Sequence, residues 1–289
     1  MGNHELMRRS LDGLSVGDAF GERFFRPEEE LLAALAERRV PARPPWTWTD
    51  DTAMALSLVE TLERHGTVEP DALAAGFARR YAAEPSRGYG GGAHEVLAAL
   101  MLGTPWQTAA RLLFDGEGSK GNGAAMRVAP LGAFFSGAPL STVVDEAHRS
   151  AAVTHAHPDG QAGAVAVAVA AHQLANGEPL ALVWTQVLAR TPPGPTRERL
   201  LKPSMLGFDV SSEHAARLLG SGQKVLSEDT VPFALWCALK HHDDFEEALW
   251  VTVAGRGDRD TTCAIVGGLV ALQDAPPEAW LRAREPLPS

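Results

Sequence analysis

Two short acidic segments of the sequence hold residues that could do chemistry, Thr49 to Thr52 (Thr-Asp-Asp-Thr) and Gly257 to Thr261 (Gly-Asp-Arg-Asp-Thr). Each lies at the start of a stretch with helical periodicity, where an Asp or Thr side chain commonly caps the free backbone N–H groups. Capping explains one carboxylate at each helix start, but each segment holds two. Binding of a ligand beside the helix start is the second interpretation, and both stay open at this point.

The two acidic segments contribute four carboxylates, those of Asp50, Asp51, Asp258 and Asp260. Asp258 and Asp260 are two residues apart, so in an extended approach to the helix they face the same way, and the Thr261 hydroxyl follows them. If both helix starts meet at one cleft, four like charges repel one another unless they are protonated or neutralised. Because oxygen ligands suit Mg²⁺, Mn²⁺ or Ca²⁺ better than Zn²⁺, the pattern favours a site for two divalent cations.

A glycine-rich loop, Phe114 to Gly123 (Phe-Asp-Gly-Glu-Gly-Ser-Lys-Gly-Asn-Gly), is the third candidate. Its glycines allow backbone N–H groups to turn inward around a phosphate, and the helix expected after it favours anions at its start. The segment is therefore a candidate diphosphate site, although a solvated loop is the alternative on spacing alone. Gly116, Gly118 and Gly121 also match GxGxxG, but the dinucleotide fingerprint needs a preceding strand, which the sequence before the loop does not suggest.

Two further patterns have simpler interpretations. Gly13 to Gly17 spells GxSxG, but no strand precedes Ser15 and the surroundings have a helical pattern, which disfavours a nucleophile elbow. His155 and His157 could ligate zinc, but no cysteine lies nearby, and a histidine beside a proline is more often a turn residue.

Apolar residues recur at helical spacing along most of the chain. The clearest helix covers 51–65, where Met54, Leu58 and Leu62 share one stripe and Gly66 is a stop signal. Further helices are predicted over 70–82, 92–102, 122–135, 140–151, 159–175, 178–190, 231–241, 244–254 and 261–273. Gly- or Pro-rich stretches predict irregular segments at 40–48, 84–92, 115–123, 191–196 and 204–230.

The pattern as a whole predicts an all-α fold in a single domain, 1–289, without an interdomain linker. Residues 164–169 alternate like a strand, but they lie inside a longer Ala-rich helical stretch. The helix over 261–273 is apolar on almost all sides, which predicts a central position, and Gly267 and Gly268 would let a neighbouring backbone approach closely.

Composition places the chain among ordinary globular proteins. Its 289 residues are 45% hydrophobic and 21% charged, which excludes disordered and fibrous classes. The formal charge of -10 makes nucleic acid an unlikely partner. Two distant cysteines, a charged N-terminus and a longest apolar run of ten residues, 162–171, favour a cytoplasmic protein without a membrane span.

Six segments between residues 17 and 261 form an ordered set: Gly17 to Gly21 (GDAFG), Thr49 to Thr52 (TDDT), Arg87 to Gly90 (RGYG), Gly121 to Arg127 (GNGAAMR), Thr154 to His155 (TH) and Gly257 to Thr261 (GDRDT). In this order they resemble the ADP-ribosylglycohydrolase family, also called the dinitrogenase reductase-activating glycohydrolase family. Any one of them is weak evidence, whereas the ordered set, especially the two acidic segments on either side of GNGAAMR, is quite specific.

The resemblance implies an orthogonal bundle of helices around two cations, Mg²⁺ or Mn²⁺, and hydrolysis of the glycosidic bond between ADP-ribose and its acceptor. The implied partners are an ADP-ribosylated protein or another ADP-ribosylated acceptor, with ADP-ribose as the product. The implied metal ligands are Thr49, Asp50, Asp51, Asp258, Asp260 and Thr261. The implied ADP-ribose site has Phe114 against adenine, His155 in the pocket, and Gly118, Ser119, Lys120, Gly121 and Asn122 near the diphosphate and ribose.

Two residues depart from the family pattern. Family members often carry a glutamate a few residues beyond the Gly-Asp-x-x-Gly turn, as a gate and acid or base, and Phe25 stands in that place. Glu22 could take this role, or Asp51, next to Asp50, could be the base. Arg259 adds a positive charge where a small residue is more usual. The acid/base assignment and the acceptor, which could be arginine, serine, a nucleobase or a small molecule, therefore stay open.

Two other functions fit parts of the sequence. Phe25 and Arg259 fit a crystallin-like or ADP-ribose-binding relative that kept the fold and lost turnover. The GxGxxG match fits an NAD-dependent oxidoreductase, which would need parallel strands.

Overall fold

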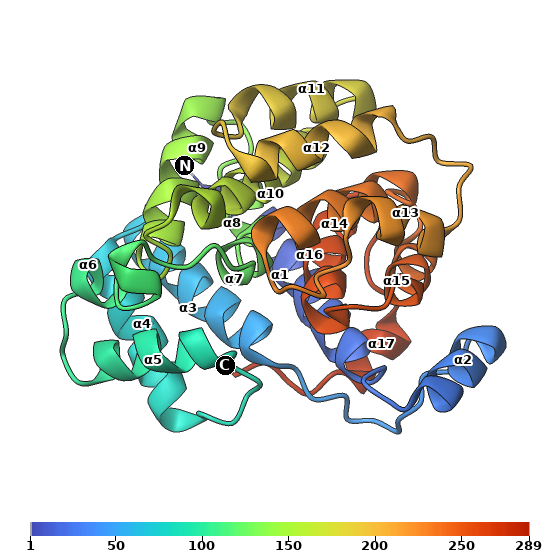
Figure 1. Cartoon of the computed structure of the whole chain (residues 1–289), viewed down its shortest axis with the longest axis horizontal. Coiled ribbons are helices and arrows are strands. Elements are labelled where there is room, and N and C mark those ends of the chain that lie inside the picture. Colours follow the sequence, from blue (N-terminus) through green and yellow to red (C-terminus); the bar gives the residue numbers. More distant parts are fainter. Residues whose placement is uncertain (1, 289) are drawn as a thin grey trace.

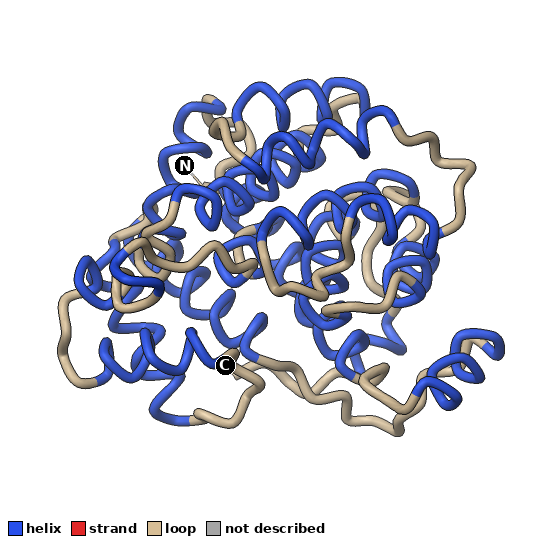
Figure 2. Tube along the Cα trace, in the orientation of Figure 1, coloured by secondary structure: helices blue, strands red, loops and turns tan. Residues whose placement is uncertain are grey.

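Helices joined by loops make up the structure. The computed structural model describes residues 2–288, and within that range the chain forms no β-strand (Figures 1 and 2). The all-α prediction is confirmed, and an oxidoreductase built on parallel strands is excluded. The elements are α1 (His4–Glu22), α2 (Glu28–Glu37), α3 (Asp50–His65), α4 (Pro70–Ala83), α5 (Gly91–Met101), α6 (Trp106–Ala109), the 3-10 turn η1 (Phe114–Gly116), α7 (Gly123–Met126), α8 (Ala129–Phe134), α9 (Leu140–Ala152), α10 (Pro158–Ala175), α11 (Leu180–Arg190), α12 (Pro195–Met205), α13 (Ser212–Leu219), α14 (Ser227–Lys240), α15 (Phe245–Ala254), α16 (Arg259–Val270) and α17 (Glu278–Ala283).

Most predicted helices match an observed helix to within four residues at each end. The helix predicted over 122–135 is wrong as a continuous element, because the chain breaks between α7 and α8. Pro130 lies in the first turn of α8 and has no N–H to bond the carbonyl of Met126, which favours a break in the helix at this point. The break leaves Arg127 inside the molecule, where it is fully buried.

The irregular segment predicted over 204–230 is wrong in part, because it contains α13. Ser211 caps this helix and accepts the backbone N–H of His214 at 3.3 Å. The prediction gives no bounds for α1, of which it notes only a helical pattern around Gly13 to Gly17. The four helices α2, α6, α12 and α17 are absent from it. Each has a proline at its N-cap or first position, which is typical of loops as well as of helix starts.

Helices α10 and α16 form the centre of the molecule (Figure 1). Helix α10 is buried from Ala162 to Leu174, and its Ala-rich stretch is helical throughout. Helix α16 is buried from Thr261 to Val270, which confirms the predicted central position. Helices α8, α9 and α11 pack on α10, while α1, α14 and α15 pack on α16.

Helices α1 and α16 pack backbone against backbone at a stripe of glycines. A Cβ added at Gly13 would lie 2.2 Å from the carbonyl oxygen of Gly267, and one at Gly17 would lie 2.0 Å from that of Cys263. The close approach predicted from Gly267 is therefore present. Gly21, at the end of the same stripe, meets the first turn of α16 in the same way. This contact fixes the start of α16 against the end of α1.

The GxSxG pattern lies within α1 and does not form a nucleophile elbow. Ser15 is buried, and its hydroxyl donates to the carbonyl oxygen of Asp12 at 3.0 Å. A nucleophile elbow requires a strand, a sharp turn and an exposed hydroxyl. The pattern is therefore part of the helix packing.

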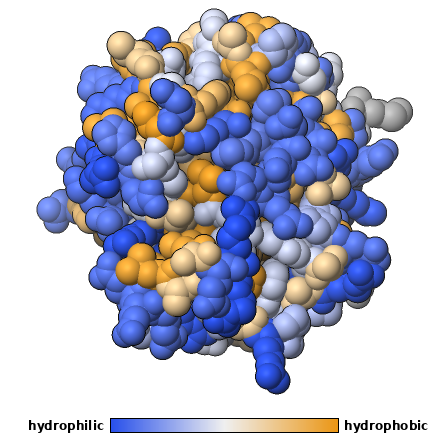
Figure 3. All heavy atoms as spheres, turned by 90° about the vertical axis from the view of Figure 1, so that its right-hand side faces the viewer, coloured by the Kyte–Doolittle hydropathy of each residue, from blue (hydrophilic) through white to orange (hydrophobic). Residues whose placement is uncertain are grey.

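The surface is mostly polar. Figure 3 shows one side of the molecule, where hydrophobic residues form small, separate patches among hydrophilic ones. Within residues 2–288, no helix has both the length and the hydropathy of a membrane-spanning segment.

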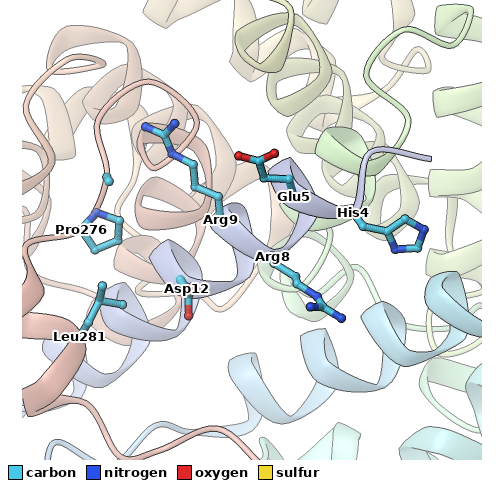
Figure 4. A pocket seen from close by; sticks show the side chains of 8 residues that line it. His4, Glu5, Arg8, Arg9, Asp12, Pro276 and Leu281 are labelled. Carbon is cyan, nitrogen blue, oxygen red and sulfur yellow. The ribbon is translucent and has the colours of Figure 1, made fainter. Parts of the chain in front are cut away.

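A shallow hollow of about 540 Å³ lies beside the first half of α1 (Figure 4). His4, Glu5, Arg8 and Arg9 line it from α1, and Pro276 and Leu281 line it from the C-terminal region. The Arg8 guanidinium pairs with Glu63 at 3.0 Å. The hollow contains neither acidic segment.

Candidate active site

Both acidic helix starts face one pocket. Helix α3 begins at Asp50 and α16 begins after Asp258, and both residues line a cavity of about 740 Å³ together with the glycine-rich loop. The meeting of the two segments, assumed from the sequence, is present in the structure. The predicted site residues that line the pocket are Asp50, Asp258, Asp260, Thr261, Phe114, Ser119, Lys120, Gly121, Asn122 and His155.

Four predicted site residues lie outside this lining, namely Thr49, Asp51, Glu22 and Gly118. Thr49 and Asp51 are buried at the start of α3. Glu22 is half-buried at the end of α1, next to Gly21, which meets the first turn of α16. Gly118 is buried, and a Cβ there would lie 2.6 Å from that of Ala156, which does not line the pocket either.

Asp18 of α1 caps the start of α3. Its carboxylate accepts the backbone N–H of Thr49 at 2.9 Å and that of Thr52 at 3.1 Å, and both threonine hydroxyls also donate to it. The Thr49 side chain makes no cap of its own. Because α3 is capped from another helix, capping accounts for neither Asp50 nor Asp51.

The start of α16 is similar. Asp258 occupies the N-cap position, but its side chain makes no capping hydrogen bond. Its Oδ2 instead accepts Nδ2–H of Asn122 at 2.6 Å, and the same amide donates to Oγ1 of Thr230 at 3.0 Å. The Asn122 side chain therefore links the glycine-rich loop to the acidic segment, and both contacts of its amide NH₂ group are made to protein atoms.

Asp51 and Asp260 carry buried oxygens that lack a protein partner. Within residues 2–288, no donor reaches Oδ1 of either residue. The other oxygen of Asp51 lies 3.5 Å from the Thr261 hydroxyl and 3.2 Å from the Thr49 hydroxyl, so Asp51 lies at the junction of the two helix starts. A buried carboxylate oxygen without a donor is costly unless it is protonated or bound by a cation.

Burial and mutual repulsion raise the pKa values of these acids. Burial is the largest cause for each, and it raises the pKa of Asp50 to about 7, with the charge of Asp18 as the next cause. The pKa of Asp51 lies well above its usual value, raised further by Asp18 and Asp260. The pKa of Asp260 is also well above its usual value, raised further by Asp258. Charges on one helix start thus act on acids of the other.

The donor set fits a hard divalent cation. Carboxylate and hydroxyl oxygens are the ligands that Mg²⁺ and Mn²⁺ prefer, and two of the carboxylate oxygens lack partners among residues 2–288. The acids of this range do not form a ready-made group of three or more metal-binding His, Cys, Asp or Glu side chains. A cation bound here would therefore draw together carboxylates that otherwise repel one another.

The glycine-rich loop differs in part from the predicted phosphate cradle. Gly118 adopts a left-handed φ of +85°. Its N–H donates to the carbonyl oxygen of Leu113 at 3.1 Å, and the Gly121 N–H donates to Oγ of Ser119 at 3.0 Å, so the loop itself uses both groups. Helix α7 is a single turn, too short for the anion site predicted at its start. Lys120 is exposed at the pocket and brings a positive charge.

Two hydrophobic side chains are held at the pocket in unusual backbone conformations. Phe114 has a φ of +55° and is 66% exposed, and Val225 has a φ of +56° and is 54% exposed. Left-handed backbone is costly for aromatic and β-branched residues, and such strain clusters at ligand sites. Core packing does not explain either side chain.

His155 and His157 do not form a metal pair. Nδ1 of His155 lies 2.7 Å from the Thr154 hydroxyl, whereas Nδ1 of His157 accepts the backbone N–H of Asp159 at 3.1 Å at the start of α10. The turn interpretation holds for His157. His155 belongs to the pocket.

The family model described as ADP-ribosylglycohydrolase matches residues 3–286, which is nearly the whole chain. The chain belongs to the ADP-ribosylglycohydrolase family. Hydrolysis of ADP-ribose linkages is the activity of this family, so ADP-ribosylated molecules are the class of substrate and ADP-ribose is the product. The resemblance carried by six segments thus extends from one end of the fold to the other.

Individual relatives match this chain over similar lengths. Human ADP-ribosylhydrolase ARH3 is 30% identical over 326 residues, covering 96% of this chain and 88% of the human protein. A protein of Archaeoglobus fulgidus is 32% identical over 289 residues, covering 96% of this chain and 90% of its own. A solved structure named ADP-ribosylglycohydrolase-related protein complex has a TM-score of 0.68 at 27% identity, covering 97% of this chain and 93% of that one.

Phe25 and Arg259, the two residues that depart from the ADP-ribosylglycohydrolase pattern, contact each other. The Arg259 guanidinium lies 5.0 Å from the ring centroid of Phe25, within the range of a cation–π contact. Arg259 is half-buried and Phe25 is 45% exposed, and neither lines the pocket. The Arg259 charge is therefore directed at an aromatic ring at the end of α1.

Sequence reasoning missed two parts of the site. It gave no role to Asp18, although Asp18 lies in one of the six segments. It also missed Lys224 to Leu226, which line the pocket from a stretch predicted to be irregular. No motif marks these three residues. They reach the pocket because Val225 accepts the backbone N–H of Asn122 at 3.1 Å, which fixes the two loops together.

Proposed function

We propose that this family member hydrolyses the glycosidic bond between ADP-ribose and an acceptor, in a reaction that depends on two divalent cations, Mg²⁺ or Mn²⁺. One observation carries the proposal: two acidic helix starts meet at one pocket, and capping uses none of their carboxylates. The unpartnered oxygens of Asp51 and Asp260 support a cation at the same place. Acids this deeply buried otherwise have to hold protons near neutral pH.

The proposed ligands are oxygen donors from the two helix starts. When bound, the cations would neutralise the carboxylates and make a nearby water more acidic. The Asp18 cap and the Asn122 amide hold the two starts in place, so their oxygens need little rearrangement. The proposed ligands are Thr49, Asp50 and Asp51 of the α3 start, with Asp258, Asp260 and Thr261 of the α16 start.

The glycine-rich loop and its surroundings are proposed to hold the ADP-ribose group. Phe114 presents an exposed ring at the pocket, which suits stacking on adenine. Lys120 supplies positive charge for the diphosphate, and His155 lines the same pocket. The loop shape depends on Gly118, Ser119, Gly121 and Asn122, whose hydrogen bonds or packing lie within the protein.

The proposed reaction adds the hydroxyl of a water to the anomeric carbon and a proton to the departing acceptor atom. Asp51, or Asp50 beside it, is proposed to take the proton from the water. Glu22 is proposed to give a proton to the acceptor atom, because burial raises the pKa of its carboxyl and so favours the protonated form. Positive charge that develops at the anomeric carbon is stabilised by the carboxylates around it.

A panel of ADP-ribosylated acceptors tests the proposal. Arginine-linked, serine-linked and nucleobase-linked ADP-ribose are incubated with the protein in Mg²⁺, Mn²⁺ or EDTA, and released ADP-ribose is measured. We expect release from at least one acceptor with a metal and none with EDTA. Release that is equal in EDTA contradicts the metal dependence.

The contact between Phe25 and Arg259 favours a second candidate, a relative that binds ADP-ribose without turnover. Phe25 stands where family members often carry a glutamate, and its side chain has no proton to give or take. This position therefore cannot supply an acid or base. This candidate predicts ADP-ribose binding in calorimetry and no release from any acceptor in the panel. Metal-stimulated release excludes it.

A further inference from the structure

Arg127 is a fully buried cation whose hydrogen bonds reach no carboxylate among residues 2–288. Its guanidinium lies 4.7 Å from the ring centroid of Phe77, and the break between α7 and α8 holds it inside the protein. Burying an arginine without an acidic partner is costly. The position therefore needs an explanation beyond packing.

The guanidinium reaches the pocket through one hydroxyl. Nη1 of Arg127 donates to the carbonyl oxygen of Gly123 at 2.9 Å, and Nη2 donates to that of Ser150 at 2.8 Å. Nη2 also donates to Oγ1 of Thr154 at 3.0 Å. A guanidinium has donors and no acceptor, so the Thr154 oxygen is an acceptor in this contact.

The hydroxyl of Thr154 can then donate its proton to His155. Oγ1 of Thr154 lies 2.7 Å from Nδ1 of His155, and within residues 2–288 it has no other hydrogen-bond acceptor in reach. A buried hydroxyl that donated to nothing would lose a hydrogen bond. The Thr154 hydroxyl therefore donates to Nδ1, and a neutral imidazole that accepts at Nδ1 carries its proton on Nε2.

The other ring nitrogen of His155 faces the glycine-rich loop. Nε2 lies 3.6 Å from the position that a Cβ would occupy at Gly121 and 3.5 Å from the one at Gly123. Cδ2 of the ring, the carbon bonded to Nε2, lies 3.0 Å from the position of a Cβ at Gly160. Glycines thus leave space for the ring, and Nε2 lies beside the loop that lines the pocket.

We propose that Arg127 and Thr154 are positioning residues, which hold His155 as a neutral imidazole that donates its Nε2 proton to an oxygen of bound ADP-ribose. The identity of the ligand rests on the function proposed above, whereas the tautomer does not. Burial, with a smaller effect from the charge of Arg127, lowers the pKa of His155 to about 3, so the ring stays neutral at physiological pH. A neutral N–H donor recognises a phosphate or ribose oxygen without adding a charge beside Arg127.

Nitrogen NMR of the histidine side chains tests the tautomer directly in the free protein. We expect His155 at pH 7 to show a protonated Nε2 and an unprotonated Nδ1. His172 is an internal reference, because its Nε2 lies 3.0 Å from the carbonyl oxygen of Ala138 and must carry the proton there. Signals of His155 are identified by their loss in His155→Gln. A charged ring, or a proton on Nδ1, overturns the proposal.

Two substitutions at Thr154 separate positioning from general stability. In Thr154→Val the hydroxyl is lost, so we expect His155 to populate both tautomers and ADP-ribose to bind about five- to tenfold more weakly. Thr154→Ser keeps the hydroxyl and should restore both the tautomer and the affinity. Unchanged tautomer and affinity in a folded Thr154→Val protein overturn the proposal. If the wild-type ring has its proton on Nε2 but ADP-ribose does not bind, the positioning stands and the proposed function fails.

Discussion

The carboxylate of Asp18 accepts the backbone N–H of Thr49 at 2.9 Å. An acid of α1 therefore caps α3 and leaves the two acids in the first turn of α3 free for the pocket. The same α1 packs backbone against backbone on α16 through its glycines. One helix thus positions both acidic helix starts, although it contributes no lining residue to the pocket.

Replacing the capping acid should destabilise the protein. In Asp18→Asn one carboxylate oxygen becomes an NH₂ group, which cannot accept from the threonines. We expect a loss of about 1–2 kcal/mol in the free energy of unfolding, measured by urea denaturation in EDTA. Asp145→Asn, at an exposed position of α9, is the matched control and should change it by less than about 0.5 kcal/mol. Equal stability of the two variants would show that the cap is unimportant.

Replacing an acid at the junction should affect activity and stability in opposite directions. Asp260→Asn removes a buried charge near Asp258, so in EDTA we expect a melting temperature equal to or above that of the wild type. The release of ADP-ribose should fall at least about 100-fold, because a proposed ligand is lost. Thermal melting and the acceptor assay measure the two effects. Unchanged turnover in Asp260→Asn is incompatible with the proposed site.

Metal binding should weaken as the pH falls from 8 to 6. Burial and the charge of Asp18 raise the pKa of Asp50 to about 7, so below that pH the metal-free carboxyl holds a proton that a cation must displace. Above it the carboxylate is already free, and the affinity should level off. Calorimetric titration of Mn²⁺ in buffers with different ionisation enthalpies measures the protons released. A Mn²⁺ affinity that does not change between pH 6 and 8 argues against binding at Asp50.

The glycine stripe of α1 should tolerate no side chain. In Gly17→Ala the new Cβ would lie 2.0 Å from the carbonyl oxygen of Cys263, so α1 and α16 must move apart. We expect a loss of about 1–3 kcal/mol in unfolding free energy, or more, with reduced metal affinity. Gly76→Ala on α4 is the control, because its Cβ would lie 3.3 Å from that of Ser57. Chemical denaturation measures the free energy of unfolding of both variants. Similar losses in Gly17→Ala and Gly76→Ala would show that the glycine stripe is no more sensitive than other helix contacts.

Phe114 should contribute to binding and little to folding. Its ring is 66% exposed, so Phe114→Ala should leave the unfolding free energy nearly unchanged. Loss of a stacking partner for adenine should weaken ADP-ribose binding by about tenfold, measured by calorimetry. Leu102→Ala, at a position that is 81% exposed and outside the pocket lining, is the control. Equal affinity in the two variants would mean that adenine does not stack on Phe114.

The parts of the site that were predictable are those encoded by local residue types. Paired acids at two helix starts and a glycine-rich loop are visible in the sequence, and helical periodicity predicts most of the helices that carry them. Sequence cannot show that both starts meet, because the meeting depends on the packing of α1 against α16. The Asp18 cap was hidden for the same reason, since it joins residues 31 positions apart.

The failures of the sequence reasoning also have local physical causes. Helices α2, α6, α12 and α17 are absent from the prediction, and each has at its N-cap or first position a proline, a residue that is typical of loops as well as of first helical turns. Pro130 interrupts the helix predicted over 122–135, and Arg127 is fully buried at the break. The left-handed backbone of Val225 has no sequence signal, because β-branched residues rarely adopt it.

The central claim, that the two acidic helix starts together bind divalent cations, is tested most directly by anomalous diffraction from crystals grown with Mn²⁺. We expect strong peaks within coordination distance of carboxylate oxygens from both starts, with those of Asp51 and Asp260 among them. Crystals with Mn²⁺ bound only elsewhere, or with no anomalous peak at saturating Mn²⁺, would contradict it.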